Sequence, residues 1–517
     1  MTCGPPPVDW NPVTTLSLAA LADLVGDPVG PAAADGPAVS GVTLASNEVR
    51  PGDLYAALPG ARTHGARYAA DAAARGAVAL LTDPTGREEA LATGLPVCVV
   101  DDPRAVLGAV ADRVYGAPSA RLTVLGITGT NGKTTTSYLV EAGLAAAGRS
   151  TGLIGTVQTQ TRAADGSVTA LPSVRTTPEA PALHALLAGM VDAGVSAVVM
   201  EVSSHALVMG RVGGVRFAAA GFTNLGRDHL DFHADMEDYF QAKALLFDGR
   251  AAVEVVDVDD AHGRRLAERP GRRVVTVATS EGATADWTAS DVATAPGGGS
   301  TFTLHGPGGR AWPARLRLPG RFNVANAVLA VALLDGVGIP VEDALTGLAA
   351  TVVPGRMEPV DAGQPFVAVV DYAHTPDAVT TALAALRPAT SGRLITVLGC
   401  GGDRDPGKRP GMGAAAAEAS DVLVVTDDNP RSEDPAVIRA AMLAGASEVP
   451  EDRRAEIIEV AGRRDALAAA VRLARAGDTL LVAGKGHETG QEVAGTVHPF
   501  DDRSVLRELL TDAGAPA

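Results

Sequence analysis

The sequence predicts an α/β protein of three domains, and three observations lead to this prediction. A chain of 517 residues is long enough for about three domains of roughly 100–200 residues each. Short apolar runs alternate with alanine-rich helical patterns along most of the chain, which is typical of mostly parallel sheets. Two segments have the composition of boundaries, YGAPSA at 115–120 and VVPGRMEPV at 352–360. They predict domains at 1–118, 119–352 and 353–517.

Seven apolar runs have the length and composition of buried strands, and helical patterns follow several of them. The predicted strands lie in 121–129, 196–204, 217–224, 366–373, 393–400, 420–428 and 478–486. The predicted helices lie in 134–148, 434–446 and 464–477. A Gly/Pro-rich patch at 294–300 predicts a loop inside the middle domain.

The bulk composition limits the class of protein. A hydrophobic content of 46% and a charged content of 20% are globular, and a net charge of −17 argues against a nucleic-acid partner. Cys3, Cys98 and Cys400 are too few for a disulfide framework or a zinc site. The N-terminus has no signal-peptide pattern, and no apolar run is long enough to span a bilayer. We therefore expect a cytoplasmic protein without membrane insertion. We also expect a monomer, although these observations do not determine the oligomeric state.

The stretch LGITGTNGKTTTSYLV at 125–140 reads as strand, glycine loop and helix. Glycines in such a loop let backbone N–H groups face phosphate oxygens, and the helix N-terminus favours an anion. Lys133 would reach the terminal phosphates, and Thr134 would bind Mg²⁺. Because Ile127 stands where the strict spacing requires glycine, the loop is a shorter variant; a glycine turn before a structural helix is the alternative. The predicted ATP contacts here are Gly129, Thr130, Asn131, Gly132, Lys133, Thr134 and Thr135.

Only four of the 43 basic residues are lysine: Lys133, Lys243, Lys408 and Lys485. Lysine can lose its proton and react, whereas arginine stays charged. Lys243 lies in DYFQAKALLFDG at 238–249, an apolar and helix-like setting. This pattern favours a chemical role for Lys243 over the alternative of an ordinary solvated lysine.

The variant loop resembles that of the Mur ligases and the related folylpolyglutamate synthetases, which form amides with ATP. The resemblance extends over roughly residues 40–500, with the motifs in the same order. It implies that the lysine corresponding to Lys243 is carbamylated by CO₂, and that the resulting carboxylate helps to hold a second Mg²⁺. Glu201 and His229, at predicted strand ends in 200–207 and 224–233, suit a Mg²⁺ site alongside Thr134. The implied catalytic residues are Lys133, Glu201, His229 and Lys243, and the implied metal ligands are Thr134, Glu201, His229 and Lys243 as its carbamate.

The same resemblance assigns further contacts and implies an N-terminal UDP-binding domain, a central P-loop ATPase domain and a Rossmann-like C-terminal domain. The residues implied for the UDP-muramoyl-dipeptide substrate are Ser46, Thr176, Thr177, Ser203, His205 and Arg211. Those implied for the rest of ATP are Asn323, Asn326, Arg356, Asp371 and His374, with Tyr372 beside them.

Three segments of the last domain bear on the incoming amine: 398–409, 427–431 (DDNPR) and 484–488 (GKGHE). The first is glycine-rich, but its spacing is wrong for dinucleotide binding. An amino acid with a second charged head needs a cation for its far carboxylate, and arginine gives a bidentate grip. The D-N-P-R pattern resembles the Mur ligases that add diaminopimelate. The residues implied for diaminopimelate are Arg404, Asp428, Asn429, Pro430, Arg431, Gly484 and Glu488.

The sequence departs from the family pattern in three places. Ala45, Ser46 and Asn47 stand where D-S-R is usual, so the uracil-side contacts do not transfer directly. Met209 replaces a common glutamine and cannot donate a hydrogen bond to the substrate. Asp257 stands where asparagine is usual.

The resemblance implies a reaction in which UDP-MurNAc-L-Ala-D-Glu attacks ATP to give an acyl phosphate, which the amine of diaminopimelate then opens, with ATP and Mg²⁺ required. Three alternatives stay open: a lysine-adding Mur ligase, a folylpolyglutamate synthetase and a non-catalytic nucleotide-binding partner. The meso and LL isomers of diaminopimelate are not distinguished, because both carry the far carboxylate.

Overall fold

The computed structural model describes residues 15–26, 29, 38–60, 62–173, 175–269, 274–295 and 299–514. Cys3 and residues 296–298 of the predicted loop at 294–300 lie outside these ranges. The chain separates into two compact units. One comprises 1–278, 284–286 and 329–347, and the other comprises 279–283, 287–328 and 348–517. The predicted boundaries at 118/119 and 352/353 remain predictions.

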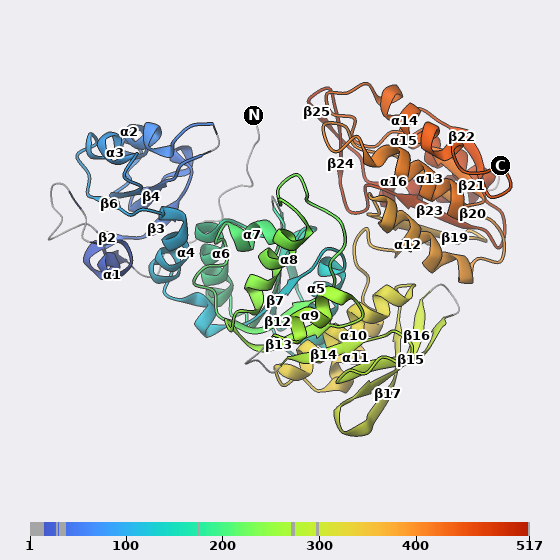
Figure 1. Ribbon diagram of the computed structural model, residues 1–517, viewed down its shortest axis with the longest axis horizontal. Helices are drawn as coiled ribbons and strands as arrows, with labels where there is room; N and C mark the ends of the chain where they lie inside the picture. The colour runs from blue at the N-terminus through green and yellow to red at the C-terminus, as the bar shows by residue number, and fades with distance from the viewer. Residues whose placement is uncertain are drawn as a thin grey trace. The chain divides into compact units, whose positions relative to one another are not determined.

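The first unit begins with a small parallel sheet of strand order β3-β4-β5-β6 (Figure 1). Its elements are β3 (Gly41–Thr43), the 3-10 helix η2 (Ser46–Glu48), β4 (Asp53–Ala57), α2 (Ala69–Ala74), β5 (Ala79–Thr82), α3 (Arg87–Leu91), β6 (Val97–Val99) and α4 (Pro103–Val114). The short strands β1 (Leu16–Ser17) and β2 (Ala38–Val39) pair antiparallel. Helix α4 begins where Asp102 accepts hydrogen bonds from two backbone N–H groups and Pro103 fixes the first turn. Apolar side chains of α4 cover one face of the sheet and alanines of α2 cover the other.

The central sheet of the first unit has the strand order β10-β9-β8-β11-β7-β12-β13-β14. Its strands are β7 (Thr123–Thr128), β8 (Thr151–Ile154), β9 (Gln158–Arg162), β10 (Val168–Pro172), β11 (Ala197–Glu201), β12 (Phe217–Phe222), β13 (Ala251–Asp257) and β14 (Val275–Ala278). Its helices are α5 (Lys133–Ala146), α6 (Ala180–Asp192), α7 (Ser204–Val208), α8 (Met236–Ala244) and α9 (Ala261–Ala267). Only β9 and β10 run antiparallel to their neighbours in this part of the chain. The carboxyl ends of β7, β8, β11 and β12 therefore meet at one edge, where α/β proteins place their chemistry.

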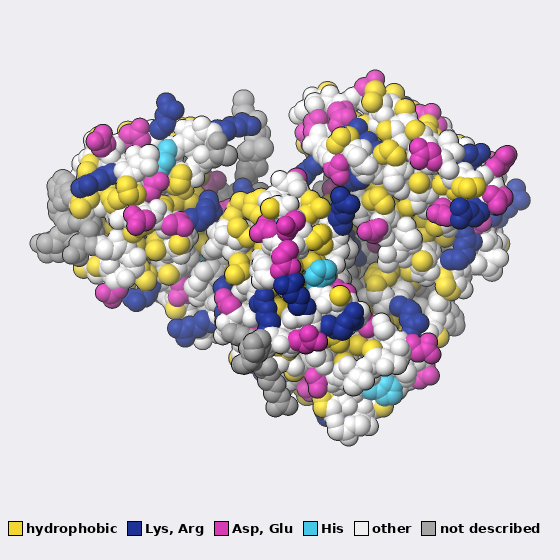
Figure 2. Space-filling model, in the orientation of Figure 1, with side chains coloured by type: hydrophobic (Ala, Val, Ile, Leu, Met, Phe, Trp, Pro, Cys, Tyr) yellow, Lys and Arg dark blue, Asp and Glu magenta, His cyan; other side chains and the backbone are white. Residues whose placement is uncertain are grey.

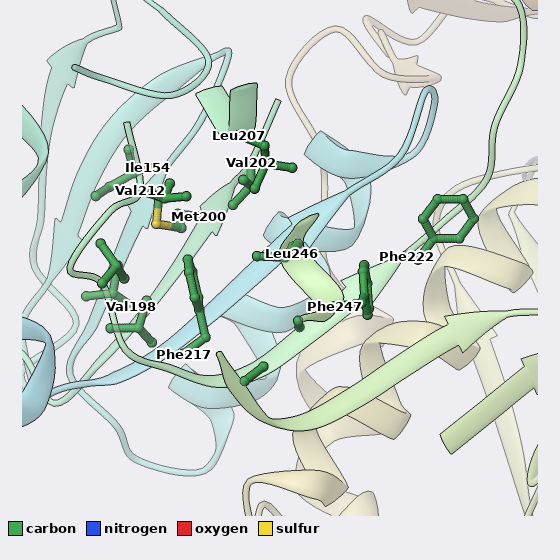
Figure 3. Close-up of a cluster of buried hydrophobic side chains, with 14 of the residues drawn as sticks. Ile154, Val198, Met200, Val202, Leu207, Val212, Phe217, Phe222, Leu246 and Phe247 are labelled. Carbon is green, nitrogen blue, oxygen red and sulfur yellow. The ribbon is translucent and has the colours of Figure 1, made fainter. Parts of the chain in front are cut away.

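One face of this sheet is closed by a large apolar cluster (Figure 3). Met200 and Phe222 contribute from the strands, and Leu207 and Phe247 from the segments that follow them. The rings of Phe222 and Phe247 meet edge to face, with centroids 6.2 Å apart. Full burial of such side chains contributes about 1.5–3 kcal/mol each, which fixes the strand ends that carry polar groups.

The second unit contains an antiparallel meander and a largely parallel sheet. The meander consists of β15 (Trp287–Thr294), β16 (Ser300–Gly306) and β17 (Arg310–Leu316). The sheet has the order β18-β19-β23-β20-β21-β22, and its strands are β18 (Glu358–Pro359), β19 (Val367–Asp371), β20 (Leu394–Leu398), β21 (Val422–Val425), β22 (Glu456–Glu459) and β23 (Thr479–Ala483). Only the short edge strand β18 is antiparallel within the sheet.

Helices cover both faces of this second sheet, as Figure 1 shows. They are α12 (Pro376–Leu386), α13 (Lys408–Ala419), α14 (Pro435–Ser447), α15 (Arg463–Leu473) and α16 (Asp502–Gly514). Side chains of α15 and α16 share one buried cluster with alternate strand residues. A hairpin, β24 (Gly490–Val493) and β25 (Thr496–Pro499), follows β23. Helices α10 (Arg321–Gly336) and α11 (Val341–Ala350) lie in the segments that join the two units.

The α/β class is confirmed, and each of the seven predicted strands and three predicted helices is present. The sequence did not predict the antiparallel strands β9, β10 and β15–β17. These strands are half exposed, so their residues alternate or mix polar and apolar types and lack the continuous apolar run of a strand buried on both faces.

The face of the molecule in Figure 2 carries Lys and Arg side chains intermixed with Asp and Glu. This mixture agrees with a protein whose anionic ligands bind at local sites. Among the described residues, no helix combines the length and apolarity needed to cross a membrane.

Asp257, which differs from the usual asparagine of the family, is buried, and its burial predicts that the free energy of unfolding depends on pH. Its carboxyl lies at the end of β13 with 8% of its surface exposed, and burial raises its pKa from 3.8 to about 7. In the unfolded chain this carboxyl loses its proton near pH 4. The free energy of unfolding therefore falls by roughly 1.4 kcal/mol per pH unit as the pH rises from about 4 to 7, and the loss is complete above about pH 7.

Asp257→Asn keeps an oxygen for the Asp259 backbone N–H, which donates to Asp257 at 2.8 Å, and removes the titration. We expect the variant to raise the thermal unfolding midpoint several degrees at pH 8 and far less at pH 4.5. An equal increase at both pH values, measured by scanning calorimetry, would contradict a buried carboxyl that titrates near neutrality.

Candidate active site

The predicted phosphate loop lies between the end of β7 at Thr128 and the start of α5 at Lys133. Gly129 has φ +145°, and a Cβ at this position would lie 1.8 Å from Thr223 Oγ1. Gly132 has φ +87°. Both positions therefore need glycine, because other residues rarely adopt these backbone angles. The resulting turn brings the backbone N–H groups at the start of α5 to the edge of the sheet, as an anion site requires.

Residues at the end of β12 hold the loop in place. Asn131 N donates to Asn224 Oδ1 at 3.0 Å, and Thr223 Oγ1 donates to the Asn131 carbonyl at 2.6 Å. Thr130 Oγ1 donates to Tyr239 OH on α8 at 3.2 Å. Two segments of the first unit, the residues after β12 and helix α8, thus fix the loop.

Two lysine amines meet at the carbonyl of Gly129. Lys133 Nζ donates to it at 2.8 Å and Lys243 Nζ at 2.7 Å, and Lys133 also reaches the Thr130 carbonyl at 2.9 Å. Lys243 is 1% exposed and lies 4.4 Å from the centroid of the Tyr239 ring. Burial, assisted by the charge of Lys133, holds the pKa of Lys243 well below its usual value. This shift favours the neutral form of the Lys243 amine, which is the nucleophilic one.

Glu201 is buried at the end of β11, and both of its oxygens are hydrogen bonded. Thr134 Oγ1 donates to Oε2 at 3.0 Å, while the Thr156 N–H and hydroxyl donate at 2.8 and 3.0 Å. The structure thus brings the predicted metal ligands Thr134 and Glu201 together. Sequence reasoning missed Thr156; its signal was its place directly after the apolar run of β8.

His229 lies on the loop after β12 with φ +54°. Its ring centroid is 5.0 Å from that of His205 and 6.0 Å from that of Tyr239, whose ring lies beside the Lys243 amine. Burial lowers the pKa of His229, although the charge of Asp228 opposes the shift. A neutral imidazole is the form that binds a metal.

The predicted Mg²⁺ ligands offer oxygen and nitrogen donors. Within the described ranges, no group of three or more His, Cys, Asp or Glu side chains gathers into a metal site. The predicted set contains two such residues, Glu201 and His229, with a hydroxyl and an amine as the other members. These oxygen and imidazole donors fit a divalent cation, and a carbamate on Lys243 would supply the missing second carboxylate.

Thr176, Thr177 and Ser203, three of the residues predicted to bind the dipeptide, lie around the Glu201 strand end. Thr177 Oγ1 donates to the Glu201 carbonyl at 2.9 Å and accepts from Ser203 N at 3.1 Å. Thr176 shares a 3.0 Å hydrogen bond with Thr156, which also contacts Glu201. Ser203 caps α7, and the pKa of His205, on the first turn of α7, falls to about 4 because of burial. Thr176, Thr177 and Ser203 therefore belong to one hydrogen-bond network with Glu201 and Thr134.

Arg211 lies at the edge of this network, 2.9 Å from Glu179 Oε1. Arg104 and Arg175 contact the same carboxylate at 3.3 and 2.6 Å, so three guanidiniums share one anion. Met209 contributes an acceptor: Arg211 Nη2 lies 3.3 Å from its sulfur. Sequence reasoning missed Arg104, which α4 brings to this point. Ser46 lies apart from these residues, on η2 after β3.

The remaining predicted ATP residues lie on the second unit. Asn326 Nδ2 donates to Asn323 Oδ1 at 3.3 Å on α10. Asp371, at the end of β19, accepts from the N–H groups of Met357 and Ala373 at 2.7 and 2.8 Å, and burial raises its pKa despite the charge of Arg356.

Aromatic rings follow Asp371 directly. Arg356 lies over the Tyr372 ring at 4.3 Å, and the Tyr372 ring lies 4.5 Å from that of His374. Arg356, Asp371 and His374 thus lie in one local group. Flat rings and a planar cation of this kind suit a base or a ribose.

The residues predicted to bind the amino acid gather at the carboxyl ends of β20, β21 and β23. Arg431 has φ +54°, donates to the Gly402 carbonyl at 2.5 Å and lies 3.4 Å from Glu492. The hairpin β24–β25 fixes its backbone, since Arg431 N donates to Glu492 O at 3.0 Å and Ala494 N to Arg431 O at 2.7 Å. Arg404 is exposed on the neighbouring loop, and Pro430 is buried.

Asn429 and Glu488 lie together deeper in this site, where Asn429 Nδ2 donates to Glu488 Oε2 at 2.8 Å. Gly484 has φ +110°, and a Cβ there would lie 2.7 Å from Asp428 Oδ2. Sequence reasoning assigned no role to Lys485, which is fully buried and donates to both Asn429 and Glu488.

A parallel sheet whose central strand runs through a glycine loop into a helix defines a P-loop type of α/β domain. Three segments of the chain match models of Mur ligase domains. Residues 127–334 match the Mur ligase middle domain, 355–486 the Mur ligase, glutamate ligase domain, and 38–115 the Mur ligase family, catalytic domain. The chain belongs to the Mur ligase family.

Whole chains are similar as well. A UDP-N-acetylmuramoyl-L-alanyl-D-glutamate–2,6-diaminopimelate ligase of Streptomyces avermitilis is 55% identical over 498 residues, covering 96% of this chain and 97% of that protein. A protein of the same name from Streptomyces coelicolor is 54% identical, with 98% of each chain covered. A solved structure with this enzyme name has a TM-score of 0.70 at 30% identity, and the match covers 97% of this chain and all of that one.

The steric requirement at Gly129 predicts the effect of adding one methyl group. We expect Gly129→Ala to weaken binding of a fluorescent ATP analogue at least about tenfold, because the loop must move away from Thr223. Gly148→Ala is the matched control: it also has a positive φ, +76°, but its Cβ would meet nothing within 4 Å. Equal nucleotide affinity of the two variants would contradict the assigned geometry.

Proposed function

We propose that this protein is an ATP-dependent ligase that joins diaminopimelate to the D-glutamyl carboxylate of UDP-MurNAc-L-Ala-D-Glu, a cytoplasmic step in the synthesis of peptidoglycan precursors. The observation that carries the proposal is similarity over nearly the whole chain to the two Streptomyces proteins that bear this enzyme's name. The arrangement of Arg431, Asn429 and Glu488 supports the choice of amino acid.

In this proposal the phosphate loop binds ATP, and its N–H groups and Lys133 offset the charge of the transferred phosphate. Lys133 is bonded to loop carbonyls in the structure, so it lies within reach of phosphates that the loop would bind. Thr134, Glu201, His229 and a modified Lys243 would hold Mg²⁺, which when bound supplies Lewis-acid stabilisation of the phosphate oxygens.

Lys243 is the proposed site of carbamylation. Its neutral amine attacks CO₂, forms an N–C bond and loses one proton, which leaves a carboxylate on the lysine stem. The burial of this amine and its depressed pKa support the step, since a protonated amine has no lone pair to give. Arginine, which stays protonated, is excluded at this position.

The two substrates would then be placed by separate groups. Arg211 and the hydroxyls of Thr176, Thr177 and Ser203 would bind the dipeptide. The attack of its D-Glu side-chain carboxylate on the γ-phosphate of ATP then gives an acyl phosphate and releases ADP. Arg404 and Arg431 would bind the far carboxylate of diaminopimelate, and Glu488 its far ammonium. The near amine displaces phosphate and forms the amide.

Three alternatives are less well supported. A lysine-adding ligase would leave Arg431, which is held by the Gly402 carbonyl and by Glu492, without a substrate carboxylate to bind. A folylpolyglutamate synthetase has no need of the N-terminal sheet, whereas residues 38–115 match a Mur ligase domain. A non-catalytic partner needs none of Lys133, Glu201 and Lys243, yet all three are present and positioned around the loop.

The proposal predicts which amino acid drives ATP cleavage. With ATP, Mg²⁺ and UDP-MurNAc-L-Ala-D-Glu, we expect phosphate release with diaminopimelate and little with L-lysine, which lacks the far carboxylate. Loss of a bidentate charged pair costs several kcal/mol, so a preference of about a hundredfold or more is expected in kcat/KM. Release with lysine alone would favour the lysine-adding enzyme, and no release with either would favour a binding partner.

Carbamylation predicts a distinctive pattern at Lys243. Lys243→Ala should lose activity that short-chain carboxylic acids partly restore, because they can occupy the position of the carbamate. Lys243→Arg should be inactive although it keeps the positive charge.

Gln241→Ala, an exposed change on the same helix, is the control and should keep normal phosphate release. Normal turnover by the arginine variant would end the carbamate assignment. So would the failure of every carboxylic acid to restore a folded alanine variant.

A further inference from the structure

Lys485 is the most deeply enclosed cation of the proposed amino-acid site. It is 0% exposed and lies between Gly484 and Gly486, whose φ angles are +110° and +53°. These two glycines follow the end of β23 and let the chain turn so that the lysine side chain points inward. Burial of an ammonium without partners is very costly, so its contacts identify what it does.

The Lys485 ammonium contacts three groups from two segments. Nζ donates to Asn429 Oδ1 at 3.0 Å and to Glu488 Oε2 at 3.1 Å, and it lies 4.0 Å from Asp428 Oδ1. It therefore joins the loop after β21 to the loop after β23. Two carboxylates offset its charge.

These contacts fix the orientation of the Asn429 amide. Its Oδ1 accepts from Lys485 Nζ and also from the backbone N–H of Glu492, at 3.0 Å. An ammonium and a backbone N–H can only donate, so the amide oxygen must face them. The amide nitrogen then necessarily faces Glu488, to which it donates at 2.8 Å.

The Glu488 carboxylate is in turn held through one of its two oxygens. Its Oε2 accepts from Lys485 and from Asn429, while within the described ranges no residue donates to Oε1. The side chain is 32% exposed, so a ligand can reach it. Lys485 and Asn429 together leave one carboxylate oxygen fixed and the other available.

We infer that Lys485 is a positioning residue that aims Glu488 and Asn429 at the far ammonium of the incoming amino acid, an inference that rests on the proposed function. Lys485 does not itself need to touch the substrate. An ammonium is suited to this place because it donates compactly in several directions, whereas the planar guanidinium is larger and rigid.

A merely electrostatic role makes the opposite prediction. Removal of a positive charge beside Glu488 would make the site more negative and would favour binding of a substrate ammonium. A positioning role predicts weaker binding, since the Asn429 amide loses one of its two donors and Glu488 loses its cation. The direction of the change in KM therefore separates the two.

The experiment compares the full-length wild-type protein with Lys485→Met in the phosphate-release assay. We expect the KM for diaminopimelate to rise about 10- to 100-fold, with the KM values for ATP and the UDP-dipeptide unchanged, since hydrogen bonds to charged groups are typically worth that factor. An unchanged or lower KM for diaminopimelate would overturn the inference.

Arg393→Met is the matched control. Arg393 pairs with the buried Asp478 at 2.8 Å. Both residues lie at the amino ends of β20 and β23, whereas the amino-acid site lies at the carboxyl ends. Loss of the Arg393 side chain should therefore lower the unfolding temperature without changing the KM for diaminopimelate. If Arg393→Met raised this KM as much as Lys485→Met, general loosening of the domain would explain both and the inference would fail.

Lys485→Gln covers the case in which the methionine variant does not fold. Glutamine can donate to Asn429 or to Glu488 but carries no charge, so an intermediate KM is expected, and a wild-type KM would overturn the inference. The wild-type protein distinguishes the two levels of the proposal. If it releases no phosphate with diaminopimelate, the proposed function has failed; if it does and the Lys485 variants match it, only the positioning role has failed.

Discussion

The carbonyl of Gly129 is the point on which the first unit's site depends. It receives hydrogen bonds from Lys133 and from Lys243, so a single backbone oxygen joins the phosphate loop to helix α8. Burial, assisted by the charge of Lys133, lowers the pKa of Lys243 and so favours its neutral form. The loop can present its carbonyl in this way only because Gly129 adopts φ +145° against Thr223. The backbone conformation of Gly129 and the lowered pKa of the Lys243 amine are therefore parts of one local geometry.

Buried polar groups at the other strand ends are likewise hydrogen bonded by residues of a different segment. Glu201 has both oxygens satisfied by Thr134 and Thr156, and Asn429 has its amide oriented by Lys485 and Glu492. In each case a buried charged or amide group is held by donors from a different segment. An unpaired polar group inside such a network is costly, so any movement that breaks a hydrogen bond is unfavourable. The paired network therefore holds the ligand-facing atoms in fixed positions. The apolar clusters behind the sheets make this possible by fixing the strand ends.

The departures from the family pattern have distinct physical consequences. Met209 loses the donor that glutamine would provide, yet its sulfur accepts from Arg211, and Glu179 holds the same guanidinium. Asp257 places a carboxyl where it is buried, with a pKa of about 7, and thus couples the stability of the central sheet to pH. Neither residue contacts the phosphate loop or the amino-acid site through the hydrogen bonds of the described residues.

The sequence by itself determined the α/β class, the strands buried on both faces and the phosphate loop, because apolar runs, glycines and one lysine act over short spacings. It also singled out Lys243, Glu201 and Arg431 from local motifs and their order. Only the tertiary structure decided that Thr156 completes the Glu201 network, that Arg104 joins Arg175 and Arg211 at Glu179, and that Lys485 orients Asn429. Thr156 and Glu201 are 45 positions apart, Arg104 and Glu179 are 75 apart, and Lys485 and Asn429 are 56 apart. A pattern along the chain carries no information about which distant side chains meet.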